Sequence, residues 1–414
     1  MGFKHIFVID LLQGPPGRDV RILCWLFSRP RHHGRLVFLL VGDSIGSIQV
    51  VAESSKVPCW LELKCLKPES SLVVFGSLAL NSNGSTEIVA KNAEIISKAT
   101  ELLHPDIRNA GASLLDSRNT DSLLSHRHLY LRNPLVIALN DYRSQSFSAI
   151  HEWFKLHRFV DISTPLITPS ILYEPNSAIH TSNVKSNRSL FLSQCAGSYL
   201  EVASHAHERV YNLGPSFRNE SRTSRHLMKY WHIKAELCSG EMHDIMDLVE
   251  IFLRDVFEAI REPTRMISAL LGTVPPIIKI PFPRITYREA LTLLNVKGHD
   301  ITFGQNVSKP AEDLLTDHFG GPIWLTHKPR ALEPFPYQLC ATDQNLTMTA
   351  DLISSGGFGE ICGVAEESFT KEQLETRLKE KGKLEMQAVY GWVLKSRSFG
   401  MVPHTALVLG LSVF

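Results

Sequence analysis

The sequence predicts an α+β protein in which a small N-terminal β-barrel precedes a larger domain of mixed helices and strands. The first observation is a set of five short strand-like runs, separated by turn signals, between residues 19 and 100. The second is the pattern after residue 133, where helical spacing of apolar residues alternates with strand-like runs. The chain has 414 residues, of which 44% are hydrophobic, so each domain can bury a sizeable core.

The predicted barrel follows an N-terminal tail of residues 1–18 and occupies residues 19–100. Turn signals separate its five predicted strands, 20–27, 36–43, 47–53, 72–80 and 86–96. The segment 29–35 (RPRHHGR) is basic, and Phe38 lies in the strand that follows it. An exposed Phe38 would suit a stacked nucleotide base, whereas alternation along the strand alone would place Phe38 in the barrel core.

A hinge is predicted over residues 101–132, because this segment has mixed polarity and no sustained period. A second domain, residues 133–414, follows it. The segment FVDISTP predicts a short strand that ends at Pro165. The spacing of apolar residues predicts two amphipathic helices and a charged, exposed one, over 141–158, 243–260 and 371–382 respectively.

The charge balance and the cysteines limit the function classes. Lys+Arg minus Asp+Glu is 43 − 42 = +1, so a nucleic-acid-binding surface must be local. The seven cysteines include no CxxC pair, and neither a secretory leader nor an apolar run of membrane-spanning length is recognised. These features predict a cytoplasmic protein with reduced thiols, not a disulfide framework or a membrane protein.

The segment 217–236 (FRNESRTSRHLMKYWHIKAE) carries the clearest chemical signal. Several basic side chains surround Glu220 in its first half, namely Arg218, Arg222, Arg225, His226 and Lys229. Its second half alternates apolar and polar residues with a period of two, which predicts a half-buried strand. Because guanidinium groups bind phosphate oxygens bidentately, the segment could hold a polyphosphate. The alternative is a solvated, charged turn.

Several segments together resemble the class II aminoacyl-tRNA synthetases of the aspartyl/asparaginyl subgroup. Residues 217–236 resemble the second class II motif, FRxE…TxRHLxEF, and the strand around Pro165 with the helix before it resembles the first motif, a dimer-interface element. Residues 123–134 resemble the hinge of this subgroup, and Asp43–Val51 resembles its anticodon-binding domain. The resemblance implies an N-terminal OB-fold barrel, a class II catalytic domain built on an antiparallel sheet flanked by helices, and a homodimer.

The resemblance also implies that ATP binds along the second motif. Arg218 would hold the α-phosphate, and Glu220 would accept a hydrogen bond from the adenine amino group. Arg225 and His226 would approach the β- and γ-phosphates, and Tyr230 would stack on adenine. Catalysis would then consist of positioning and charge neutralisation, without a covalent nucleophile.

The remaining ligands implied by the resemblance are Mg²⁺ and tRNA. Glu360, in the segment GGFGEICG, would hold Mg²⁺ together with Asp351. The barrel would contact the tRNA anticodon through Arg31, Phe38 and Gln49.

The amino-acid pocket is implied by residues 190–201 (LFLSQCAGSYLE), which resemble the family pattern LSQSPQLYxE and supply Gln194 and Glu201. Glu201 stands where the asparaginyl branch carries an acid, which would accept a hydrogen bond from a carboxamide and repel a carboxylate. Trp231 is asparaginyl-like as well. Asparagine is therefore the expected substrate, and the alternative is that Glu201 is a surface residue of a helix.

Glu367 departs from the family pattern, because it stands where the family has a substrate-binding arginine. An unpaired buried carboxylate is costly, so this site would either hold a cationic amine or lie open to water. Lysyl members of the subclass carry a glutamate at the same offset as that from Glu360 to Glu367. A basic substrate is therefore an alternative.

The segment 401–414 (MVPHTALVLGLSVF) resembles a degenerate and truncated third motif. Ala406 and Val408 replace glycines, Ser412 replaces an acid, and Val413 replaces the arginine that clamps ATP. We therefore expect an asparagine–tRNA ligase. The alternatives are an impaired paralogue or truncated product that binds tRNA or protein, and an adenylating enzyme with an amine substrate.

Overall fold

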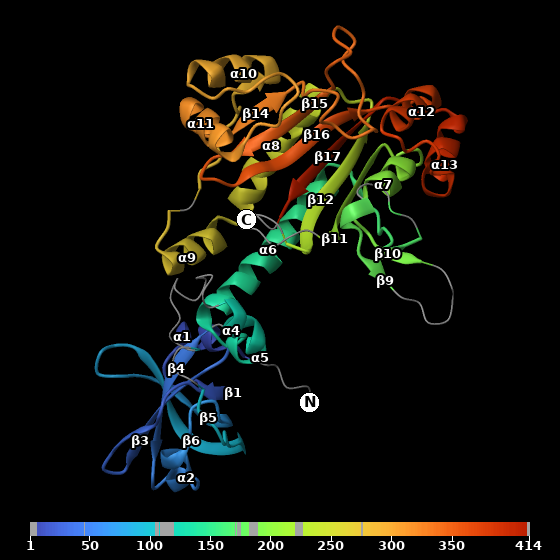
Figure 1. Ribbon diagram of the computed structural model, residues 1–414. Helices are drawn as coiled ribbons and strands as arrows, with labels where there is room; N and C mark the ends of the chain where they lie inside the picture. Colours follow the sequence, from blue (N-terminus) through green and yellow to red (C-terminus); the bar gives the residue numbers. More distant parts are fainter. Residues whose placement is uncertain are drawn as a thin grey trace. The chain divides into compact units, whose positions relative to one another are not determined.

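The computed structural model describes residues 6–44, 46–103, 107, 120–169, 171, 175–181, 189–219, 227–274 and 276–411. The chain divides into two compact units, of which the first comprises Met1–Ser144 with Glu262–Pro275. The second unit comprises Gln145–Arg261 with Pro276–Phe414. Figure 1 shows the barrel of the first unit in blue and the large sheet of the second unit in green to red.

The first unit is built on a closed, five-stranded barrel, as the sequence predicts. The barrel strands are β1 (Asp19–Leu26), β3 (Leu36–Gly42), β4 (Ser47–Glu53), β5 (Ser71–Leu80) and β6 (Thr86–Ser97), and the short β2 (Arg31–His33) joins the same sheet outside the closed ring. They are hydrogen-bonded in the order β1-β5-β6-β4-β3-β2, and a further pairing of β1 with β3 closes the barrel. The β4–β6 pair is parallel and the others are antiparallel, and β2 extends β3 as a short hairpin.

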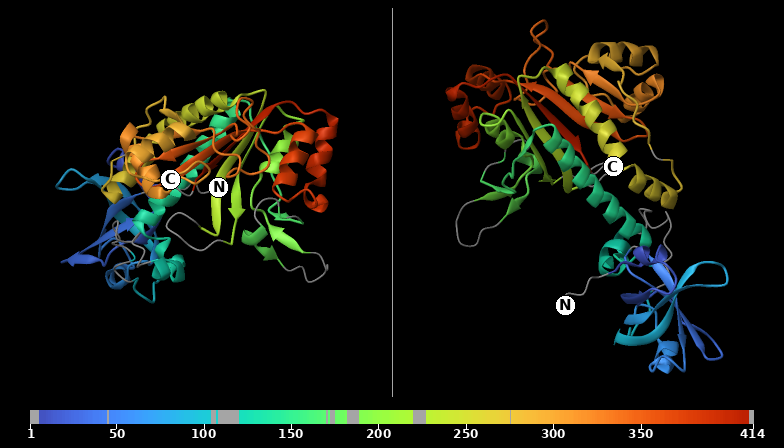
Figure 2. Two further views of the ribbon diagram at one scale, coloured as in Figure 1. Left: turned by 45° about the horizontal axis from the view of Figure 1, so that its top comes forward. Right: turned by 180° about the vertical axis from the view of Figure 1, so that it is seen from behind.

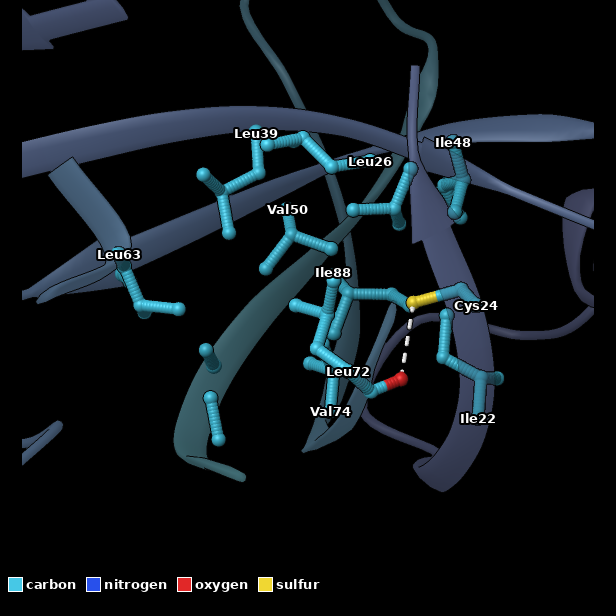
Figure 3. Packing of buried hydrophobic residues seen from close by; sticks show 14 of the residues in the cluster. Ile22, Cys24, Leu26, Leu39, Ile48, Val50, Leu63, Leu72, Val74 and Ile88 are labelled. Atoms are coloured by element: carbon cyan, nitrogen blue, oxygen red, sulfur yellow. Dashed lines mark hydrogen bonds between the residues drawn. The ribbon is translucent and has the colours of Figure 1, made fainter. Parts of the chain in front are cut away.

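Strict alternation builds the barrel core. Along β1 every second side chain is buried, and β3 buries Val37, Leu39 and Val41 in the same way. Figure 3 shows interior side chains of the barrel, among them Ile22, Cys24 and Leu39, and the Cys24 thiol donates a hydrogen bond of 3.6 Å to the Leu72 carbonyl. Phe38 is only half-buried, so the prediction that alternation places it in the core is wrong. Its two neighbours on the strand occupy the interior face.

Short helices accompany the barrel, α1 (Val8–Leu12), α2 (Trp60–Cys65), α4 (Thr120–Ser125) and α5 (Arg127–Tyr130). Val8 and Leu11 of α1 belong to the barrel core, and the Val8 N–H donates to Asp43 Oδ2 at 2.7 Å. Part of the predicted tail is therefore packed against the barrel. The chain then enters α6 (Pro134–Leu156), and α9 (Arg261–Leu271) belongs mainly to the same unit.

The second unit contains an eight-stranded sheet in the order β13-β14-β15-β16-β17-β12-β11-β7. The strands are β7 (Val160–Asp161), β11 (Arg209–Phe217), β12 (Lys229–Cys238), β13 (Arg284–Thr286), β14 (Ile323–Thr326), β15 (Thr349–Ser354), β16 (Gly359–Glu367) and β17 (His404–Gly410). All neighbours pair antiparallel except β7 with β11 and β13 with β14. The strand predicted to end at Pro165 is thus the two-residue β7.

Helices cover one face of this sheet. The C-terminal half of α6 and α8 (Met242–Ala259) pack there, as the rear view in Figure 2 shows. Phe147 of α6 lies 5.1 Å from the Trp231 ring, and Phe154 stacks on Tyr211 at 4.2 Å. Both predicted helices exist, although α6 begins at Pro134, before the predicted start at residue 141. The opposite face, called here the open face, carries the polar residues of β12, β16 and β17.

Smaller elements complete the second unit. A three-stranded sheet and α7 lie beside the open face, and two helix pairs lie at the ends of the large sheet (Figure 1). These elements are β8 (Ile167–Thr168), β9 (His180–Thr181), β10 (Leu190–Leu192), α7 (Gly197–Ala203), α10 (Tyr287–Val296), α11 (Lys309–Phe319), α12 (Lys371–Glu380) and α13 (Gln387–Ser396). The prediction that 371–382 is an exposed helix is wrong for one face, because Leu374 and Leu378 of α12 are buried against α13.

The described helices contain no apolar stretch long enough to span a bilayer, and all seven cysteines are free thiols.

Two neighbouring leucines test the barrel core. Leu39 is fully buried, whereas Leu40 is 40% exposed. Leu39→Ala should lower the free energy of unfolding by about 2–5 kcal/mol, because it removes a buried isobutyl group and leaves a cavity. Urea unfolding followed by circular dichroism measures this difference. Leu40→Ala is the matched control and should change the free energy by less than about 1 kcal/mol; equal losses in both variants would contradict the assigned faces.

Candidate active site

The second motif lies on β11 and β12, at the centre of the sheet. The two strands pair from Arg209 opposite Leu237 to Phe217 opposite Lys229, and the Arg218 N–H donates to the Met228 carbonyl at 2.9 Å. This pairing holds Arg218 at the strand end. Glu220, Arg222, Arg225 and His226 belong to the connecting segment 220–226, which lies outside the described residues.

Arg218, Tyr230 and His232 of this motif lie next to one another in a row. The Arg218 guanidinium carbon lies 5.8 Å from the centre of the Tyr230 ring, and that ring lies 5.6 Å from His232. Ser216 Oγ and His232 Nε2 share a hydrogen bond of 3.1 Å. Burial lowers the pKa of His232 to about 3, and the nearby charges of Lys234 and Arg218 add to the effect. The imidazole is therefore neutral, and the positive charge near it comes from Lys234 and Arg218.

Asp351 and Glu360 meet on the adjacent strands β15 and β16. Asp351 pairs with Gly363, and a Cβ atom on Gly363 would lie 3.3 Å from Glu360 Oε1 and 3.6 Å from Asp351 Oδ1. Both oxygens thus approach the space that the missing side chain leaves. The Asp351 carboxylate raises the pKa of Glu360 to about 8. Paired carboxylate oxygens are the ligands that hard divalent cations prefer, so this pair fits a magnesium-type ion.

Lys328 lies next to this carboxylate pair, which the sequence did not predict. Its Nζ atom is 2.5 Å from Asp351 Oδ2 and 2.7 Å from Glu333 Oε1. Burial alone would lower the pKa of Lys328, but these two carboxylates raise it. Lys328 therefore holds Asp351 in place through one oxygen and leaves the other directed toward Glu360.

Two of the three residues predicted for the amino-acid pocket, Glu201 and Glu367, come together beside α7, with carboxylate oxygens within 4.8 Å of each other. Gln194 is buried and donates from Nε2 to Ser177 Oγ at 3.2 Å. Glu201 is 3% exposed and Glu367 is 7% exposed, so Glu201 is not a surface residue of its helix. Glu201 lies in α7 and Glu367 lies in β16, far apart in the sequence. Only the resemblance to the synthetase family therefore predicted that they would be close together.

Two basic residues that the sequence did not single out neutralise Glu201. The Arg397 guanidinium contacts Glu201 Oε1 and also donates to the carbonyls of Ser368 and Val393. His404 Nε2 lies 3.6 Å from the same Glu201 oxygen. Burial alone would raise the pKa of Glu201, but Arg397 and His404 lower it. His404 belongs to the VPH of the third motif, whereas nothing in the local sequence marks Arg397.

The barrel residues implied as anticodon contacts lie on one face of the first unit. Arg31 is exposed and pairs with Phe38, which is half-buried, across the β2–β3 hairpin. Gln49 of β4 lies opposite Leu40 and donates from Nε2 to Glu87 at 2.8 Å. Side chains of directly paired residues, and of residues two positions apart, share a face. The three side chains therefore lie on the outer face of the barrel.

The sheet and its open polar face are of the kind found in class II tRNA synthetases. A family profile described as tRNA synthetases class II (D, K and N) matches residues 119–412. This is more than half of the chain, so the chain belongs to this family.

Solved structures support the same architecture. Asparaginyl-tRNA synthetase from Pyrococcus horikoshii, complexed with asparaginyl-adenylate, superposes with a TM-score of 0.86 at 26% identity, covering 100% of this chain and 94% of that chain. Two proteins from Entamoeba histolytica share the fold. Its asparaginyl-tRNA synthetase gives a TM-score of 0.81 at 23% identity and coverages of 97% and 92%. Its aspartyl-tRNA synthetase gives 0.81 at 22% identity and coverages of 99% and 87%.

His232 provides a pH-dependent test. The folded-state pKa is lowered to about 3, so as the pH falls below the ordinary value the unfolded chain takes up a proton that the folded chain does not. The free energy of unfolding should therefore decrease by about 2 kcal/mol between pH 6.5 and pH 5 through this residue alone. His232→Gln should remove this part of the slope in urea unfolding curves. The exposed His318→Gln should keep the wild-type slope, and parallel curves for all three proteins would contradict the assignment.

The carboxylate pair predicts a divalent-cation site. Glu360→Gln removes one of the two anionic ligands, so the affinity for Mn²⁺, used as a probe, should fall at least about tenfold. Electron paramagnetic resonance of free Mn²⁺ measures the binding. Glu375→Gln on the exposed face of α12 changes the net charge equally and should leave the affinity unchanged. Equal affinities for all three proteins would rule out the pair as ligands.

Proposed function

We propose that this protein is an asparagine–tRNA ligase, which activates asparagine with ATP and transfers it to tRNA. The observation that carries the proposal is the joint position of Arg218, Tyr230, Asp351 and Glu360 on the open face of one mostly antiparallel sheet. An arginine, an aromatic ring and a carboxylate pair supply a phosphate ligand, a surface for a purine and a site for a divalent cation. The family membership and the superposition on an asparaginyl-adenylate complex support it.

In this proposal, residues of the chain position ATP instead of reacting with it. Arg218 binds the α-phosphate and stabilises the charge that develops as the amino-acid carboxylate attacks. Tyr230 stacks on adenine, while Glu220, Arg225 and His226 bind the adenine amino group and the outer phosphates. Asp351 and Glu360 would hold Mg²⁺, which supplies charge neutralisation at the phosphates when it is bound.

The asparagine side chain would lie among Gln194, Glu201 and Glu367. A carboxamide needs one acceptor for its amino group and one donor for its carbonyl oxygen. The buried carboxylates of Glu201 and Glu367 offer acceptors, and the amide of Gln194 offers a donor. The same carboxylates repel the charge of aspartate, which separates asparagine from its acidic counterpart.

A second candidate is activation of a basic amino acid or another amine, and Glu367 carries it. This carboxylate is buried, and His404 Nε2 lies 3.5 Å from its Oε2 atom, which is longer than a charge-assisted hydrogen bond. A substrate ammonium group would neutralise it. The product would then be an adenylate of a cationic amino acid, with or without transfer to tRNA.

A third candidate is a non-ligating module that binds tRNA or protein. Val408 and Ala406 stand in place of glycines on β17, and Val408 pairs with both Lys234 and Gly363. Their side chains therefore project onto the open face and reduce the space for ATP. Ser412 and Val413, which replace the acid and the ATP-clamping arginine, lie outside the described residues.

The proposal includes the partners of such a ligase. The tRNA anticodon would bind the outer face of the barrel at Arg31, Phe38 and Gln49, where a basic side chain and an aromatic ring lie together. The ligase would act as a homodimer in the cytoplasm. Loss of tRNA binding on Arg31→Ala, with amino-acid activation intact, would locate this contact.

ATP–pyrophosphate exchange with each of the twenty amino acids tests the three candidates. We expect exchange with asparagine, and a decrease of roughly 10²–10³-fold in Arg218→Ala, because a charge-stabilising donor is lost. Arg254→Ala, an exposed arginine of α8, should keep the wild-type rate. Exchange with lysine but not asparagine would establish the second candidate. No exchange, with tRNA binding retained, would establish the third.

A further inference from the structure

His404 lies between two buried carboxylates on the open face. Its Nε2 atom is 3.6 Å from Glu201 Oε1 and 3.5 Å from Glu367 Oε2. The three donor atoms all lie within 4.8 Å of one another, and all three residues are buried. β16 and β17 set this arrangement, because Glu367 and His404 are directly paired, and α7 brings Glu201 to them.

The hydrogen bond made by His404 Nδ1 determines what His404 Nε2 can bind. Nδ1 lies 3.1 Å from the Val402 carbonyl oxygen, so Nδ1–H donates to the backbone. Nε2 is therefore the ring nitrogen directed toward the two carboxylates. Nε2 has no hydrogen-bond partner among the residues that the structure describes. A cation between the three groups would bind Nε2 and both carboxylates, and a backbone-bonded imidazole is the usual geometry of a metal-ligating histidine.

The distances from His404 Nε2 to the two carboxylate oxygens fit a bound metal ion better than they fit hydrogen bonds from Nε2–H. A charge-assisted hydrogen bond between imidazolium and carboxylate is about 2.7–2.9 Å long. Donors bound tetrahedrally to zinc at about 2.0–2.2 Å lie about 3.4 Å apart. The measured 3.5 and 3.6 Å match the second value.

A further buried acid, Glu236, lies beside the cluster on the open face. It lies on β12 opposite Ala406, two residues along β17 from His404, and so shares the open face with the cluster. It is 2% exposed, and its Oε2 atom has no hydrogen-bond partner in the described ranges.

Arg397 lies beside the cluster and contacts one of its carboxylates. Arg397 contacts Glu201 Oε1, but a carboxylate oxygen has two lone pairs and can accept from a guanidinium while it binds a metal. Arg397 therefore orients Glu201 without removing it as a ligand.

We propose that Glu201, Glu367 and His404 bind a divalent transition-metal ion of the zinc type. The site is separate from the Asp351–Glu360 pair, which offers only oxygen donors. Three protein ligands leave a fourth tetrahedral position for water or for the carboxamide oxygen of asparagine. With the ion bound, Glu201 and Glu367 would meet the asparagine side chain through the metal and not directly. This use of the site rests on the proposed function, whereas metal binding does not.

Metal content and Co²⁺ spectroscopy of the full-length protein test this site. After treatment with a chelator and addition of Zn²⁺, the wild type should retain one equivalent of Zn²⁺ per chain, measured by inductively coupled plasma mass spectrometry. Co²⁺ in its place should give the intense visible bands of a tetrahedral ion. Glu367→Gln should weaken Zn²⁺ binding at least about tenfold.

Two control variants distinguish this site from nonspecific Zn²⁺ binding and from the Asp351–Glu360 pair. Glu366→Gln changes the next residue, which accepts from the Met242 N–H on the helix-covered face, and should bind Zn²⁺ as the wild type does. Asp351→Asn should also retain Zn²⁺. Absence of Zn²⁺ and of the Co²⁺ bands in the wild type, or equal Zn²⁺ affinities in Glu367→Gln and Glu366→Gln, would overturn the proposal.

The wild-type measurements show whether the protein binds the metal even where a variant fails to fold. They need no ATP or tRNA, so they stand apart from failure of amino-acid activation.

Discussion

The pairing register of β12 with β11 and β17 is the constraint on which the second unit depends. Alternation along β12 turns Trp231 and Ile233 toward α6 and α8, and Lys234 and Glu236 toward the open face. A slip of one residue would exchange the faces, placing charges against the helices and apolar side chains on the polar side. Hydrophobic burial on one face and the cost of burying charge on the other therefore select the same register.

The open face contains two clusters of charge, and each is balanced by a residue from a distant part of the chain. Lys328 serves the Asp351 cluster, and Arg397 serves Glu201 across 196 positions of sequence. Buried ion pairs of this kind contribute little net stability, because desolvation offsets the attraction. Their presence on one face is therefore better explained by the binding of charged ligands than by the stability of the fold.

Local patterns in the sequence predict the strands and most helices, because side-chain periodicity depends only on neighbours along the chain. Even the early start of α6 has a local signal, since Asn133 Oδ1 accepts from the Leu135 N–H ahead of a helix that begins with Pro134. The ion pairs made by Lys328 and Arg397 have no such signal. Their partners meet only after β14, β15, α7 and the segment after α13 are assembled, so no spacing along the sequence reveals them. The resemblance to a family supplied the site residues of the second motif, and physical periodicity alone did not.

Gly363 illustrates how an absent side chain can define a site. Its backbone lies beneath the Asp351 and Glu360 oxygens, where even a methyl group would come within 3.3 Å of one of them. The distance between the two carboxylates is thus governed by a vacant volume and not by a contact. A larger residue other than proline would leave the sheet hydrogen bonds intact, since it can adopt the extended backbone there, and would still force the two acids apart. Function at this position is therefore more sensitive to substitution than stability is.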